Sequence, residues 1–129
     1  MIQKNILVLA IISMSLLSAC QIESQKELVK KIGTRAGELE LKYENGQATL
    51  SGILQRSTPC VNWAVEIGST KDLPISSVNI DIFDSNKGAI CIQVLGEPQE
   101  IKETIVQVSE KTKYTVTFEE ETLFSGKLE

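Results

Sequence analysis

The sequence predicts an all-β protein whose folded part is a small antiparallel β-sandwich of immunoglobulin-like or related type. Three observations lead to this class. From Glu38 onward, apolar and polar residues alternate with the period of two that marks half-buried strands. Turn residues such as Gly, Pro, Asn and Asp recur at roughly 8–12-residue intervals. No stretch after Gly37 has the period of a long amphipathic helix, so two packed sheets are the simplest core. A small closed barrel is the alternative.

The first element, residues 1–19, has the features of an export signal. Lys4 supplies an early positive charge, and an unbroken apolar run follows from Ile6 to Ile12. The apolar stretch is short for a membrane span. We therefore expect a signal peptide, with an uncleaved anchor, an ordinary secretory signal or a core helix as alternatives.

The end of this element resembles the lipobox of prokaryotic lipoproteins. It reads Leu17-Ser18-Ala19-Cys20, a branched residue, two small residues and a cysteine. The resemblance implies cleavage before Cys20 and lipidation of its thiol, with fatty acids such as palmitate holding the protein on the extracytoplasmic face of a cell-envelope membrane. Two acyl chains are enough for stable anchoring.

Residues 20–37 follow as the lipidated cysteine and a predicted tether. The segment is polar and of mixed charge, and Gly33 and Gly37 interrupt its few apolar residues. We expect a flexible linker here, with a short recognition helix as the alternative. The β-sandwich domain is accordingly predicted to span residues 38–129.

The strands of that domain are expected in a regular order. Asn45-Gly46 is a strong hairpin signal between an alternating segment from Glu38 and a return strand to Gln55. The later strands are predicted near residues 61–67, 77–82, 89–95, 101–108, 114–118 and 123–128. The segment 89–95 is apolar on both faces, which favours a central strand. About seven or eight strands result.

The cysteines predict one disulfide. With Cys20 lipidated, an exported chain retains only Cys60 and Cys91. A pair of free thiols in a redox or metal site is the alternative, but two thiols without histidine make a poor zinc site. Closing this loop is worth roughly 3–4 kcal/mol in the chain-entropy model.

Three aromatic residues have expected positions. Trp63 suits the core near the disulfide, and Tyr43 and Tyr114 suit half-buried sheet positions with their hydroxyls at the rim. Together with the Thr58-Pro59-Cys60 turn, Cys91 and Tyr114 give the mature chain a resemblance to small envelope lipoproteins with a β-sandwich domain. That resemblance implies no activity.

The composition excludes several functions. The chain has no histidine, which rules out Ser-His-Asp and Cys-His catalysis and His-ligated zinc. Acidic residues number 17 against 13 basic ones, so binding to nucleic acid is not expected. We expect no catalytic residues, no metal site and no cofactor.

Two acidic groups are candidate sites. Glu119-Glu120-Glu121 could contribute to Ca²⁺ binding, but a solvated hairpin tip is the simpler interpretation. Asp81 and Asp84 could pair as acid and base in a glycosidase, but their spacing near a strand end argues against it. Neither group carries a prediction of chemistry.

The predicted function is a membrane-anchored, non-enzymatic binding, adhesion or assembly module. Its partners would be the membrane, through the lipid anchor, and an envelope protein bound by the loops. The candidate loops are Asn45–Gly46, Ser57–Pro59, Gly68–Pro74 and Ser85–Gly88. An inhibitor of an extracytoplasmic protease is the first alternative, and an enzyme is the second.

Overall fold

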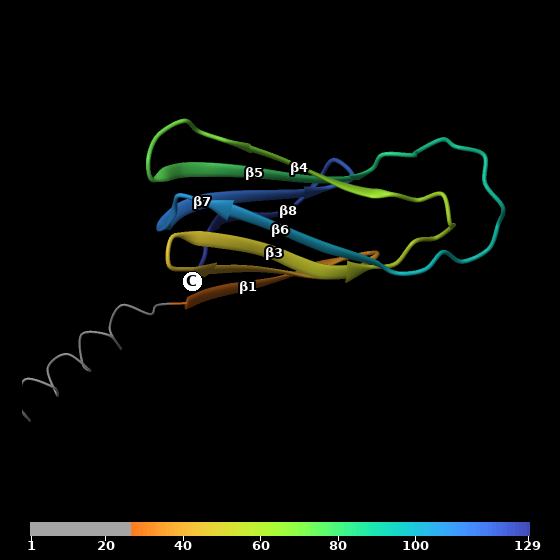
Figure 1. Cartoon of the computed structure of the whole chain (residues 1–129), viewed down its shortest axis with the longest axis horizontal. Coiled ribbons are helices and arrows are strands. Elements are labelled where there is room, and N and C mark those ends of the chain that lie inside the picture. The colour runs from red at the N-terminus through yellow and green to blue at the C-terminus, as the bar shows by residue number, and fades with distance from the viewer. Residues whose placement is uncertain (1–26) are drawn as a thin grey trace, which may run out of the picture.

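The computed structural model describes residues 27–129, and within them it confirms an all-β sandwich of two four-stranded sheets (Figure 1). Eight strands follow one another along this part of the chain. They are β1 (Glu27–Thr34), β2 (Gly37–Glu44), β3 (Gln47–Leu54), β4 (Trp63–Ser69), β5 (Ile75–Asp84), β6 (Gln99–Val106), β7 (Val108–Phe118) and β8 (Glu121–Lys127).

Three connections pass from one sheet to the other: β3–β4, β5–β6 and β6–β7. Sheet A has the order β1-β2-β3-β6 and sheet B the order β4-β5-β7-β8. All pairs are antiparallel except β5 and β7, which run parallel because β6, between them in sequence, lies in the other sheet. The long connection between β5 and β6 therefore crosses from sheet B to sheet A at one end of the sandwich.

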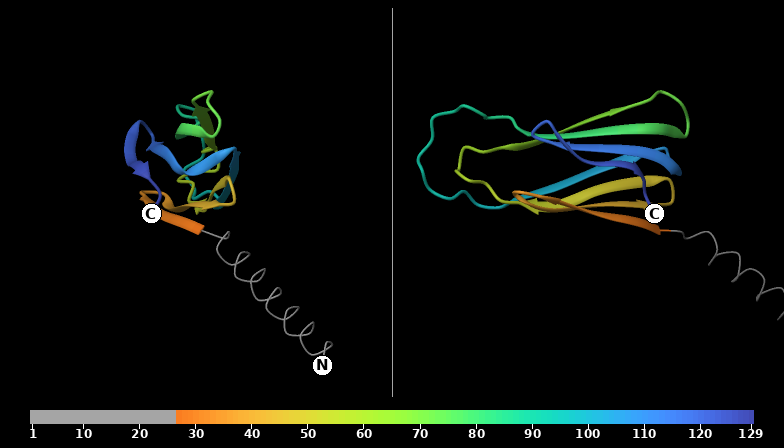
Figure 2. Two further views of the ribbon diagram at one scale, coloured as in Figure 1. Left: turned by 90° about the vertical axis from the view of Figure 1, so that its left-hand side faces the viewer. Right: turned by 180° about the vertical axis from the view of Figure 1, so that it is seen from behind.

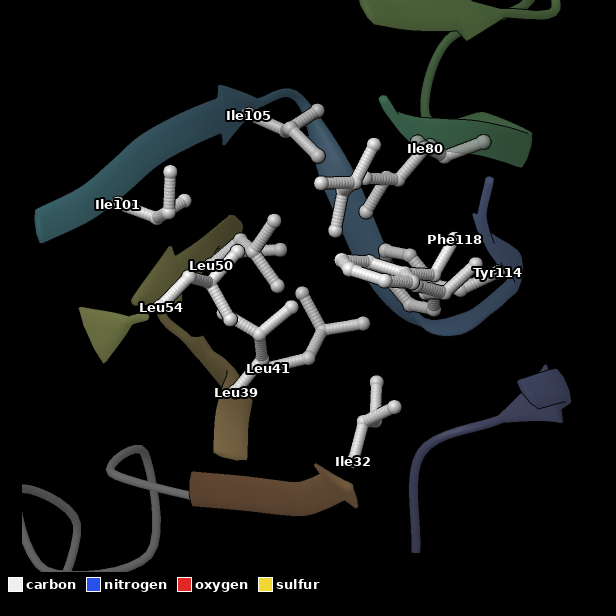
Figure 3. Packing of buried hydrophobic residues seen from close by; sticks show 14 of the residues in the cluster. Ile32, Leu39, Leu41, Leu50, Leu54, Ile80, Ile101, Ile105, Tyr114 and Phe118 are labelled. Atoms are coloured by element: carbon white, nitrogen blue, oxygen red, sulfur yellow. The ribbon is translucent and has the colours of Figure 1, made fainter. Parts of the chain in front are cut away.

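The alternation seen in the sequence corresponds to the buried faces of both sheets. Leu39, Leu41 and Leu50 of sheet A are completely buried against residues of sheet B. Figure 3 shows these side chains opposite Ile80 and Phe118. Burying a side chain of this size stabilises the fold by about 1.5–3 kcal/mol, so the interface between the sheets is the main source of stability.

The segment before Gly37 corrects the predicted domain boundary. Glu27–Thr34 is a strand that pairs with β2 along its whole length, so the tether cannot extend to residue 37 and the sandwich domain includes residues from 27 onward. The period of two is weak here because β1 is an edge strand. Only Ile32 is fully buried, while the neighbouring lysines stay in solvent.

Gly37 makes the turn from β1 into β2 possible. Its φ is 151°, and a Cβ at this position would lie 2.4 Å from the carbonyl oxygen of Ile53. Thr34 closes the turn, since its Oγ1 accepts hydrogen bonds from the backbone N–H groups of Ala36 and Gly37, both at 3.0 Å. The glycine that suggested a break in the chain is therefore required by close packing against β3.

The segment 89–95 also differs from its prediction. It forms no strand but belongs to the connection between β5 and β6. Its apolar residues were expected to be buried on both faces, yet Ile90, Ile92 and Val94 are all exposed. The reason is topological. Sheets A and B are complete without this segment, and it lies beyond the end of both.

The aromatic predictions have mixed outcomes. Trp63 is buried as expected, and its ring centroid lies 4.9 Å from that of Phe118. Tyr114 was wrongly placed at the rim, because it is 1% exposed and its hydroxyl makes no hydrogen bond. Burial raises the pKa of Tyr114 to about 12, so its phenol stays neutral.

The sandwich has two chemically different ends. Figure 1 and the reverse view in Figure 2 show that β1 begins and β8 finishes at the same end. We call this the near end; it also carries the β2–β3 and β4–β5 connections. The far end carries the β3–β4 and β5–β6 connections and the short β1–β2 and β7–β8 turns.

Candidate interaction site

The far end is built from two long loops that a disulfide joins. Residues 55–62 connect β3 to β4, and residues 85–98 connect β5 to β6. Cys60 and Cys91 form the predicted disulfide, with their Cα atoms 6.0 Å apart and a sequence separation of 31. The bond links the middle of one loop to the middle of the other, so neither loop can move far without the other.

Backbone hydrogen bonds tie the same loops together on both sides of the disulfide. Gly96 N donates to Arg56 O at 3.0 Å, and Ser85 N donates to Asn62 O at 2.9 Å. Asn86 Nδ2 donates to Cys60 O at 3.0 Å. The ends of the longer loop are thus fixed by protein contacts.

Arg56 adds a side-chain clamp between the loops. Its Nε donates to the carbonyl oxygen of Glu97 at 2.6 Å, and its Nη1 lies 3.4 Å from the carbonyl oxygens of Pro59 and Val61. A guanidinium suits this task because its five N–H groups radiate in a fixed plane. Arg56 is therefore occupied by the protein itself and is not a free cation for a ligand.

Gln99 anchors the far end to both sheets. Its side-chain Oε1 accepts from Trp63 N at 2.9 Å, and its Nε2 donates to Trp63 O at 2.8 Å. Trp63 Nε1 in turn donates to Gln55 O at 3.0 Å. These bonds connect β6 of sheet A with β4 of sheet B where the two loops leave the sandwich.

The exposed aliphatic residues gather in the middle of the longer loop. We call residues 90–95 the apolar segment. Ile90 is 102% exposed and Leu95 76%, with Ile92 and Val94 also exposed. These are four of the eight exposed large hydrophobic residues in the described part of the chain. Such a concentration of aliphatic surface marks an interaction site in a soluble domain more often than scattered apolar residues do.

A small hollow lies beside the apolar segment, above Trp63. Its volume is about 170 Å³, and Leu95 and Trp63 contribute to its lining. Arg35 also lines it, with its guanidinium 5.7 Å from the Trp63 ring and 5.5 Å from the Phe118 ring. The Arg35 side chain also forms an ion pair with Glu119. The side chains around this hollow therefore form the edge of the core, next to the exposed loop.

The structure brings the two acidic groups of the sequence into one place. Asp81, Asp84, Glu119 and Glu120 line a pocket of about 370 Å³ together with Lys87 and residues of sheet B. The sequence does not predict that these carboxylates lie close together. Glu119 and Glu120 belong to the β7–β8 turn, and only the parallel pairing of β5 and β7 brings them near β5.

The aspartates of this pocket have structural roles. Asp81 accepts a hydrogen bond from Thr117 Oγ1 at 2.8 Å. Asp84 Oδ1 accepts from the backbone N–H groups of Asn62 and Asn86, at 3.0 Å and 2.9 Å. Among the described residues, no group of three or more potential metal ligands is arranged to hold an ion. Asp81 thus links β5 to β7, and Asp84 orients the two far-end loops.

The near end contrasts with this arrangement. The predicted Asn45-Gly46 turn joins β2 to β3, with φ angles of 49° and 79° at its two central residues. The β4–β5 loop is held by its own side chains, since Asp72 Oδ1 accepts from Thr70 Oγ1 at 2.5 Å and from Ser76 N at 3.2 Å. These hydrogen bonds lower the pKa of Asp72 to about 2.

The four predicted binding loops are therefore divided between the ends. Ser57–Pro59 and Ser85–Gly88 lie together at the far end, while Asn45–Gly46 and Gly68–Pro74 lie at the near end. Cys20 and the signal segment lie outside the described residues. No helix of residues 27–129 is long and apolar enough to cross a membrane.

Comparisons with known proteins give no relative from which a function could be transferred: no protein-family model, curated protein or solved structure matches this chain.

Proposed function

We propose that this chain is a lipid-anchored protein of the cell envelope whose sandwich domain is a non-enzymatic binding or assembly module. The domain engages its partner through the far end. The observation that carries this proposal is the position of the apolar segment, which lies on disulfide-joined loops at the opposite end of the sandwich from Glu27.

The position of the proposed anchor is consistent with a binding surface at the far end. The predicted lipidated residue, Cys20, precedes Glu27 by seven positions, and Glu27 begins the edge strand at the near end. An anchor attached there leaves the far end free to face away from the membrane. Metabolic labelling with a clickable fatty acid tests the anchor. The wild type is expected to be labelled and Cys20→Ser not, and equal labelling of both would contradict it.

The apolar segment favours moderate affinity. It contains aliphatic side chains and no Trp, Tyr or Arg, the residues that dominate the strongest interface contacts. We expect dissociation constants on the order of micromolar. Confinement to a membrane surface compensates by raising the local concentration of both partners.

The experiment compares capture from crosslinked envelopes by full-length wild type and two double variants. Ile90→Ser with Ile92→Ser removes aliphatic surface from the far end. Val29→Ser with Val106→Ser is the matched control, since these residues are 36% and 52% exposed and lie on sheet A, away from the far-end loops.

The proposal predicts that the far-end variant loses the partners captured by wild type and that the control keeps them. Equal capture by all three proteins would refute the far end as the binding surface. A captured protease that the wild type inhibits would favour the inhibitor alternative instead.

A further inference from the structure

The apolar segment has the sequence of a β-strand, but it pairs with no strand among residues 27–129. Its residues are Ile90-Cys91-Ile92-Gln93-Val94-Leu95, with β-branched side chains at alternate positions. The backbone hydrogen bonds of this loop stop at Ala89, which donates to Asn86, and resume at Gly96, which donates to Arg56. No residue from 90 to 95 makes a hydrogen bond to any other described residue.

These free backbone groups can accept a strand. A row of unpaired N–H and C=O groups is the surface to which another strand adds. No residue from Ala89 to Leu95 has a positive φ, so the backbone lies in the half of conformational space that strands use. The segment bends at Gln93 and Val94, and this bend must straighten for pairing along its full length.

The sequence around the segment is complementary to itself. In an antiparallel pair of identical strands centred on Ile92, residue 92 faces its own copy and residues 90 and 94 face each other. The flanking Gly88 and Gly96 then correspond, and Lys87 of each copy corresponds to Glu97 of the other. Both charged residues are exposed, and neither has an ion-pair partner among residues 27–129.

We infer that the far end binds a second copy of this chain by antiparallel pairing of residues 89–95 in the register centred on Ile92. This inference rests on the proposed function and specifies its partner. The two copies exchange backbone hydrogen bonds, and Ile90 of one contacts Val94 of the other. The Lys87–Glu97 pairs, formed twice by the two-fold symmetry, fix the register.

The first arm of the test locates the contact. Full-length lipidated protein, half of it labelled with heavy isotopes, is reconstituted into phosphatidylcholine vesicles and treated with a zero-length carbodiimide crosslinker. The inference predicts a peptide pair that joins Lys87 of one isotope form to Glu97 of the other. Absence of mixed-isotope pairs at these residues would overturn it.

The second arm reverses the charges and measures self-association of detergent-solubilised full-length protein by sedimentation. Lys87→Glu and Glu97→Lys each place like charges opposite one another, and each should weaken the dimer about tenfold. Mixing the two variants, or combining both substitutions in one chain, restores opposite charges and should restore association. Lys111→Glu and Glu103→Lys are controls at exposed sites outside the far end.

The two proposals fail in different ways. A double charge-reversal variant as weak as the single variants would overturn self-pairing in this register. If self-pairing fails while Ile90→Ser with Ile92→Ser still loses a captured envelope protein, the far end binds a different partner and the proposed function stands. If Ile90→Ser with Ile92→Ser captures the same proteins as the wild type, both the self-pairing inference and the proposed function are contradicted.

Discussion

The chain reverses its direction at both ends of this sandwich, but different interactions hold the two sets of connections. At the near end, short turns are held by local hydrogen bonds, as in the Thr70–Asp72–Ser76 network. At the far end, long loops are held by contacts distant in sequence, chiefly the Cys60–Cys91 disulfide. Local turns leave little surface for a partner. The joined loops fix their own bases while their middle stays exposed, and this is the arrangement that display of a binding surface requires.

The largest expected effect comes from removing the disulfide. Replacing both Cys60 and Cys91 with serine should lower the free energy of unfolding by about 3–4 kcal/mol, because the unfolded chain regains the entropy of a 31-residue separation. Denaturant unfolding measures this loss. Hydrogen exchange should become faster at the hydrogen-bonded amides of the two loops, such as those of Val61, Ser85 and Gly96, while exchange at the Asn45–Gly46 turn changes only as far as global unfolding requires. An equal increase in exchange rate at both ends would show that the disulfide does not act specifically on the far end.

A smaller effect is expected from the near end. Gly46→Ala should cost about 1–2 kcal/mol, because the residue has a φ of 79° that a side chain disfavours. The added Cβ would meet only Val108 O at 3.8 Å, so the cost is conformational and not steric. Gly33→Ala is the matched control, since its Cβ would meet nothing within 4 Å and its φ is not left-handed. Equal losses in both variants would show that the turn does not set the hairpin.

The smallest effect is a pH dependence at the near end. The folded-state pKa of Asp72 is about 2, below its ordinary value of 3.8. Its stabilising contribution is therefore complete above about pH 4 and disappears as the pH falls toward about 2. Thermal unfolding midpoints of wild type and Asp72→Asn should converge over this range. A difference that stays constant with pH would show that the charge on Asp72 is not what holds the loop.

Much of the near end could be predicted from the sequence because its determinants are local. Asn45 and Gly46 carry the turn conformation in their own residue types, and the alternating leucines of β2 point to one face. The disulfide followed from cysteine counting. The β1 strand could not be read as easily, since Ile32 is its only fully buried residue.

The structure of the far end depends on how the strands pair, which no local sequence pattern contains. The composition of residues 89–95 predicts a strand, and only the complete pairing of β3 with β6 and of β4 with β5 shows that the segment is left without a neighbour. The meeting of Asp81 with Glu119 likewise requires the parallel β5–β7 pair. The mismatch between strand propensity and the absence of a pairing strand is what distinguishes the candidate interaction site from the other loops.

If the far end binds a partner in the cell, its apolar segment is covered there, and side-chain footprinting measures that coverage. Hydroxyl radicals would be generated in intact envelopes and, separately, with purified protein diluted to the monomer. We expect Ile90, Ile92 and Leu95 to be strongly oxidised in the monomer and protected in envelopes, while Val29 and Val106 are oxidised equally in both. Equal oxidation of the apolar segment in the two preparations would show that the far end is not a binding surface.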